Sequence, residues 1–140
     1  MRVIITIDNN SKIMVLPYVT SDMVKINYGQ SSAQNSDSVK YGQIKTLGPE
    51  PLAMVSITGI FPKGRLPFME RDAKTEPMDY VKFFRNNRRD RKPFRVIITR
   101  RDGREVFNRL MSCESFEISP AGRNGEIPYQ LDFEQYRMVR

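Results

Sequence analysis

The chain has 140 residues, which is the size of one domain, and 39% of them are apolar. One cysteine and no histidine exclude an internal disulfide, histidine-based catalytic triads and the usual zinc sites. The net charge of +7 is uneven, because residues 71–140 hold 16 basic and 11 acidic side chains against 7 and 5 in residues 1–70. A basic surface of this kind suits acidic proteins, nucleic acid or anionic lipid.

Alternating apolar residues predict an N-terminal β-hairpin, because every second side chain of a strand lies on the same face. The cluster Asp8-Asn9-Asn10-Ser11 separates its two strands, and Asp and Asn tolerate the left-handed backbone of a tight turn. The polar segment 29–38 is expected to be an exposed loop. Gly59 is expected to mark a bulge or a close approach of the backbone. We expect strands over residues 3–7, 12–16, 23–28, 39–47 and 54–61, with Val24, Ile26 and Tyr28 facing inward.

One helix is predicted, over about residues 77–90. Thr75 or Glu76 can cap its N-terminus, and Pro77 fits the first turn, where no backbone N–H is needed. Its last turns carry several arginines, which the negative end of the helix dipole favours. An apolar stripe at helical spacing is expected to face the core, formed by Tyr80, Val81 and Phe84.

The second half of the chain predicts further antiparallel strands. Phe94, Val96 and Ile98 alternate along one strand, and the Asp102-Gly103 pair that follows is a strong hairpin signal. The fold class is therefore mainly β (α+β), an antiparallel β-sandwich or barrel with one inserted helix that covers one opening. We expect one or two strands over 105–119 and a last strand over 127–137, with Val106, Leu110, Phe116, Ile118 and a further candidate, Phe107, facing inward.

Several segments in order resemble a known family. These are Ile7-Asp8-Asn9-Asn10, the strand end Phe61-Pro62, the helix over 80–89, Lys92-Pro-Phe-Arg-Val-Ile-Ile-Thr99, and the ending Gly125-Glu-Ile-Pro-Tyr-Gln-Leu-Asp-Phe-Glu-Gln-Tyr-Arg137. Together they are similar to the N-terminal domain of the LysM-type baseplate proteins, which connect to the hub in contractile phage tails and phage-tail-like bacteriocins. Glu126 and Gln135 depart mildly from the family pattern of Asp and Glu at these positions.

The resemblance implies a structural role and not an enzymatic one. It predicts a single domain over residues 1–140 in the tail baseplate, synthesised in the cytoplasm of the bacterial host. The domain would connect the central hub or tail tube to the surrounding wedge or sheath, in six copies per particle. No cofactor, metal or membrane is expected. No LysM module follows within the sequence, so glycan binding is not carried over from the family.

The candidate interface is a basic run together with the end of the last strand, formed by Arg85, Arg88, Arg89, Arg91, Lys92, Tyr136 and Arg137. Three interpretations are open: a solvated helix end, a surface that matches acidic neighbours in an assembly, or a phosphate-binding patch over residues 85–101. The alternative function is thus a small basic nucleic-acid-binding β-barrel. It is disfavoured because no exposed series of aromatic residues accompanies the basic run. Strand carboxylates such as Glu114 and Asp132 are expected to be solvated or paired and not catalytic.

Overall fold

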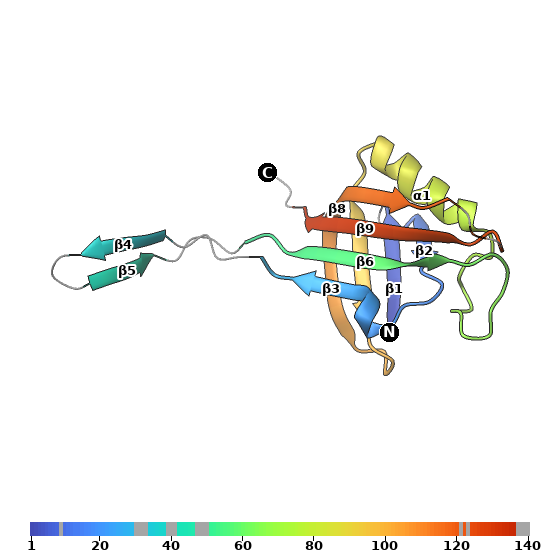
Figure 1. Ribbon diagram of the computed structural model, residues 1–140, viewed down its shortest axis with the longest axis horizontal. Coiled ribbons are helices and arrows are strands. Elements are labelled where there is room, and N and C mark those ends of the chain that lie inside the picture. Colours follow the sequence, from blue (N-terminus) through green and yellow to red (C-terminus); the bar gives the residue numbers. More distant parts are fainter. Residues whose placement is uncertain are drawn as a thin grey trace.

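The computed structural model describes residues 1–8, 10–29, 51–120, 122 and 124–136, and the backbone of two short strands at 34–38 and 42–46. Most of these residues form one antiparallel sheet of seven strands in the order β2-β1-β7-β8-β9-β6-β3 (Figure 1). The fold is mainly β with one inserted helix, as predicted. The sheet strands are β1 (Arg2–Ile7), β2 (Lys12–Val15), β3 (Val24–Asn27), β6 (Met54–Phe61), β7 (Phe94–Thr99), β8 (Glu105–Ile118) and β9 (Ile127–Gln135).

A second, two-stranded sheet consists of β4 (Gln34–Ser38) and β5 (Gly42–Thr46), which pair with each other. Figure 1 shows this hairpin extending away from the seven-stranded sheet. The expected strand over 39–47 is confirmed as the shorter β5, whereas the expected loop over 29–38 is wrong where β4 forms. The segment Gly48-Pro49-Glu50-Pro51, whose Gly and Pro residues predict a turn, lies outside the described residues apart from Pro51.

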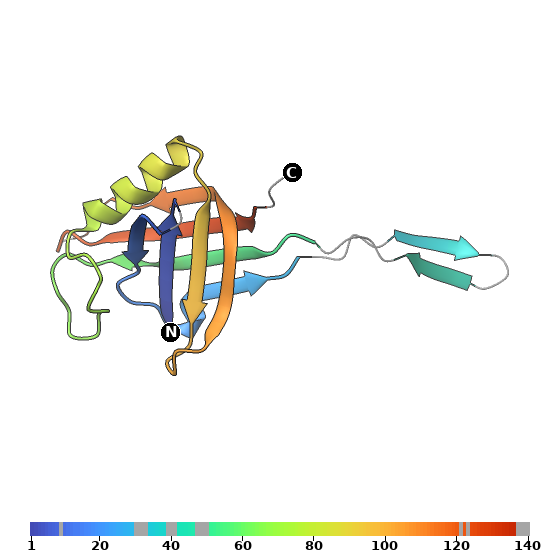
Figure 2. The ribbon, with the colours of Figure 1, turned by 180° about the vertical axis from the view of Figure 1, so that it is seen from behind.

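The long strand β8 divides the sheet into two halves. Its first half pairs with β7 up to Phe94↔Met111, and its second half pairs with β9 from Met111↔Gln135 onward. The register shifts between Cys113 and Ser115, and a bulge of this kind bends a strand. Figures 1 and 2 show β1 and β7 running across the direction of β6 and β9. The edge strands β2 and β3 do not pair with each other in the described part of the chain, so the barrel alternative is wrong.

The bulge also reverses which side chains of β8 face the core. Phe107 and Met111 are buried in the first half, whereas Phe116 packs against the core in the second half. The expected inward placement of Val106 is therefore wrong, because its side chain is 41% exposed. Leu110 is half-buried on that same outer side, and Ile118 is exposed at the end of the strand. Tyr28 is also exposed, because β3 ends at Asn27.

The core lies between the two halves of the sheet and the helix α1 (Pro77–Arg89). Phe61 is at its centre, stacked on Tyr80 with ring centroids 4.7 Å apart and on Tyr129 with centroids 3.9 Å apart. Gly59 pairs with Tyr129 across β6 and β9, and a Cβ atom at Gly59 would lie 3.0 Å from the Tyr129 hydroxyl. The expected close approach at Gly59 is thus confirmed.

Helix α1 begins and ends as its sequence predicts. The Glu76 side chain accepts a hydrogen bond from the Met78 N–H, and Pro77 occupies the first turn. The predicted stripe is buried, with Tyr80 and Phe84 fully covered. At the other end Arg91 adopts a left-handed φ of 57°, which turns the chain from the helix into β7.

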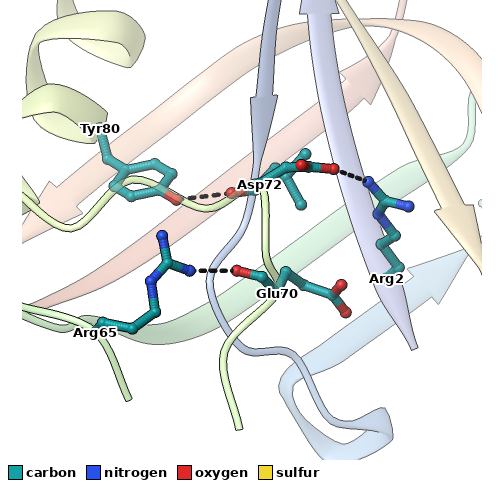
Figure 3. A network of polar contacts seen from close by, with 6 residues as sticks. Arg2, Arg65, Glu70, Asp72 and Tyr80 are labelled. Carbon is teal, nitrogen blue, oxygen red and sulfur yellow. Dashed lines mark hydrogen bonds and ion pairs between the residues drawn. The ribbon is translucent and has the colours of Figure 1, made fainter. Parts of the chain in front are cut away.

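The irregular segment 62–76 between β6 and α1 is held by polar contacts (Figure 3). Arg65 donates to the carbonyl oxygens of Glu70 at 2.8 Å and Ala73 at 3.0 Å. The Tyr80 hydroxyl accepts from the Lys74 N–H at 2.8 Å and donates to the Val15 carbonyl at 2.7 Å. Arg2 forms an ion pair with Asp72 at 2.9 Å. These contacts fix the shape of a segment that has no helix or strand.

Candidate assembly interface

The structure brings the C-terminal end of α1 next to the end of β9. Arg88, Arg91, Lys92 and Tyr136 line one surface pocket of about 260 Å³. Arg85, Arg88 and Arg89 line a neighbouring groove of about 540 Å³, so Arg88 borders both. Six of the seven predicted interface residues therefore lie on one continuous surface, hereafter the basic surface. Arg137, the seventh, lies outside the described residues.

Arg88 has a structural task within this surface. Its Nε donates to the carbonyl oxygen of Cys113 at 3.1 Å, and its Nη2 donates to that of Glu114 at 2.8 Å. Both carbonyls belong to the β8 bulge, where ladder pairing is interrupted. Arg88 therefore ties α1 to the bulge and is less available to a partner than its sequence position indicates.

Other charges of the basic surface are partly matched within the chain. Lys92 Nζ lies 2.8 Å from Asp8 Oδ2, and this hydrogen-bonded carboxylate raises the pKa of Lys92. Arg89 lies 3.6 Å from Asp90, and both side chains are exposed, so the attraction is weak. Arg85 and Arg91 are exposed and make no ion pair with another described residue. These two arginines are the charges most available to an acidic neighbour.

Tyr136 offers an aromatic ring beside these charges. Its backbone N–H donates to the Leu110 carbonyl at 2.8 Å, which fixes the position of the residue just after β9. Its side chain is 44% exposed and lines the same pocket as Arg91. Tyrosine and arginine together are typical of the residues that dominate binding energy in protein interfaces.

The thiol in this pocket is not a reactive group. Cys113 is half-buried, and burial raises the pKa of its thiol to about 11. The thiol is therefore protonated at neutral pH, and a thiol attacks far less readily than a thiolate. Cys113 therefore has the character of a small, half-buried apolar residue.

The strand carboxylates lie elsewhere. Glu114, Asp132 and Glu134 line a groove of about 460 Å³ on the outer face of β6, β8 and β9, together with Lys25. Ser56 donates a hydrogen bond to Asp132 there. Among the described residues, no group of three Asp, Glu or Cys side chains is placed to hold a metal ion. No helix in the same residues has the length and hydropathy to cross a membrane.

The proposed phosphate track over residues 85–101 is spread along the sheet. Arg91 precedes β7 and Arg101 follows it, so the whole strand separates them. Arg95, midway, donates to the Asn108 side chain at 2.9 Å. Basic residues therefore lie at both ends of β7, and Arg95 between them is already hydrogen-bonded to Asn108.

Comparison with known proteins concerns the fold alone. No protein-family model matches the chain, and no curated protein sequence matches it. A chain from the virion of the native gene transfer agent particle superposes with a TM-score of 0.57 at 18% identity, covering 97% of this chain and 92% of that one. A chain from the tail of the empty gene transfer agent particle, solved with C6 symmetry, gives a TM-score of 0.49 at 19% identity, covering 99% and 93%. Over nearly its whole length, this chain has the fold of a protein found in a gene transfer agent virion.

Proposed function

We propose that the protein is a structural component of a phage tail or tail-like particle. The observation that carries the proposal is the fold shared with a gene transfer agent virion chain across 97% of the sequence. The ordered sequence segments from Ile7 to Arg137 support the same class of protein, because they resemble baseplate proteins of contractile tails. The first line of support rests on the course of the backbone and the second on residue identities.

Within such a particle, the finer role is that of a baseplate connector. The protein joins the central hub or tail tube to the surrounding wedge or sheath, in six copies around the tail axis. This role needs no catalytic group and no cofactor, because it depends on shape and charge. Arg85 and Arg91 on the basic surface meet acidic side chains of a neighbouring subunit, and matched charges set the register and specificity of such a contact.

The test is particle assembly with and without the protein. Tails are produced from a host in which the gene is deleted, and again with the wild-type chain supplied in trans. The proposal predicts tubes and sheaths that fail to join in the deletion strain and complete, contractile tails after complementation, both visible by negative-stain microscopy. Complete particles that contract in the deletion strain would contradict the connector role.

A salt titration of DNA binding then separates the remaining alternative. For a nucleic-acid-binding protein, the logarithm of the binding constant falls steeply and linearly with the logarithm of the salt concentration. The reason is that binding releases counterions from the phosphates. Tight DNA binding at physiological salt, together with intact particles in the deletion strain, favours the nucleic-acid interpretation.

A further inference from the structure

The groove between α1 and the second half of β8 has an apolar floor and a cationic rim. Its floor is formed by Val81, Phe116 and Ile118, and Ile118 is 46% exposed. Phe116 packs on Phe84 of the core with ring centroids 5.4 Å apart, so the floor is firmly supported. Arginine guanidinium groups at the rim can lie over an aromatic ring that enters the groove. The groove therefore offers both apolar contact and cationic groups to an aromatic side chain.

The same chain presents an exposed aromatic pair on a different surface. Phe68 is 59% exposed and Tyr18 is 38% exposed, and their rings meet edge to face with centroids 4.7 Å apart. Contiguous exposed apolar groups are typical of interaction sites, and these two rings lie in contact with each other.

The backbone that carries this pair is fixed. The Glu70 N–H donates to the Pro17 carbonyl at 2.9 Å, which ties the two segments that bear the rings. Met69, next to Phe68, is buried. Arg65 donates to the Glu70 carbonyl, as Figure 3 shows, and also to the Ala73 carbonyl, and both contacts hold the same loop. A surface ordered in advance loses little conformational entropy on binding, which makes Phe68 an effective anchor.

The aromatic pair and the groove cannot meet within one molecule. In Figures 1 and 2 the loop between β6 and α1 lies at one lower corner, whereas α1 and the adjoining part of β8 lie along the top. We propose that the Phe68–Tyr18 pair of one copy docks in the α1–β8 groove of a second copy. Both halves of the contact are present in this chain, which is why the occupant is another copy.

This contact is head-to-tail, because it joins two different surfaces. Repetition of such a contact produces a ring when the rotation closes. The inference deepens the proposed function and rests on it for the setting, since neighbouring subunits that touch one another in a ring around a tail axis do so through a contact of this type.

The experiment separates the two halves of the contact. Phe68→Ala removes the anchor and keeps the groove. Ile118→Asp keeps the anchor and removes apolar floor, while its carboxylate neutralises the arginine rim. Val106→Ala is the matched control, because Val106 is 41% exposed at the other end of β8. Circular dichroism and urea unfolding establish that all variants fold like the wild type.

Sedimentation velocity over a wide concentration range measures self-association. The wild type and Val106→Ala are expected to associate, and each contact variant alone is expected to bind itself at least about tenfold more weakly. An equimolar mixture of Phe68→Ala and Ile118→Asp can form one intact contact, so it is expected to give 1:1 dimers that grow no further. A monomeric wild type at its highest soluble concentration, or a mixture that forms no dimers, overturns the proposal.

Failure of the proposed contact between copies can be told apart from failure of the proposed function. Incorporation of the same variants into tails is measured separately by complementation of the deletion strain. If the isolated wild type never associates but both variants fail to enter particles, the occupant is a different protein and this inference is wrong, while the structural role stands.

Discussion

Tyr80 and Tyr129 both stack on Phe61, but their hydroxyl groups have opposite surroundings. The Tyr80 hydroxyl makes two hydrogen bonds, to Lys74 and Val15. The Tyr129 hydroxyl is buried and has no hydrogen-bond partner among the described residues. A buried polar group without a partner costs free energy, whereas a bonded one contributes. The two tyrosines therefore form a matched pair for measuring that difference in one core.

We predict that Tyr80→Phe lowers the free energy of unfolding by about 1–3 kcal/mol, because the Lys74 N–H and the Val15 carbonyl lose their partner. Tyr129→Phe should leave the stability unchanged or raise it, since only an unpaired hydroxyl is removed. Urea denaturation followed by circular dichroism measures both. A loss of stability in Tyr129→Phe as large as that in Tyr80→Phe would contradict this account of the core.

Ionisation of these two buried tyrosines makes the stability of the fold depend on pH in the alkaline range. Burial raises the pKa of Tyr80 to about 12 from an ordinary value near 10.0, and it raises the pKa of Tyr129 as well. Because the pKa of Tyr80 is higher in the folded than in the unfolded state, the stability that its neutral hydroxyl contributes is fully present below pH 10. This stability is lost as the pH rises from about 10 toward 12. We predict that unfolding free energy falls in this window, and falls less in Tyr80→Phe. Thermal unfolding across alkaline buffers checks the difference between the two proteins.

At the scale of elements, the bulge in β8 decides which parts of the fold could be predicted. The hairpin turns, the helix with its caps and its buried stripe follow from local sequence signals, and they form as expected. Alternation also identified 105–119 as strand. It could not show that the register shifts between Cys113 and Ser115, because a bulge depends on pairing with a strand distant in sequence. The inward side of the first half of β8 was therefore assigned to Val106 and Leu110, with Phe107 only as a further candidate.

The same bulge explains why one interface residue differs from its neighbours. Arg88 and Arg85 look equivalent in the sequence, since both are exposed arginines one turn apart on α1. Only Arg88 reaches the Cys113 and Glu114 carbonyls. No local signal could have shown this, because the carbonyls come from the second half of the chain.

We predict that Arg88→Ala lowers the free energy of unfolding by about 1 kcal/mol, because two charge-assisted hydrogen bonds are lost at an exposed site. Arg85→Ala, the control on the same helix face, should change it by less than about 0.5 kcal/mol. Chemical denaturation of both variants tests the pair. Equal losses of stability in the two variants would show that the hydrogen bonds from Arg88 to the β8 carbonyls do not contribute to stability.

At the scale of the whole molecule, the sheet folds over through β8 and places the ends of α1 and β9 side by side. The order β2-β1-β7-β8-β9-β6-β3 could not be read from the sequence, because it combines strands far apart in the chain. The basic run and Tyr136 were chosen from charge and from the residue types typical of interfaces, and the structure places them around neighbouring pockets. The groove and the exposed Phe68 had no sequence signal, since exposure depends on the packing of the whole fold.

The basic surface should act through its uncompensated charges. We predict that Arg85→Glu combined with Arg91→Glu reduces incorporation into tails about tenfold or more at physiological salt, because like charges then face an acidic neighbour. Arg101→Glu, on the β7–β8 turn at the other end of β7, is the control and should assemble normally. Quantitative immunoblotting of purified tails gives the incorporation. Equal incorporation of both proteins would remove the basic surface from the proposed contact.

The most direct test of the central claim is to locate the chain in purified particles by electron cryomicroscopy. The account predicts density for the seven-stranded sheet in a ring of six copies between the hub or tail tube and the wedge or sheath, with the C-terminal end of α1 facing a neighbouring subunit. Tails that are complete and contain no copy of the chain would contradict it.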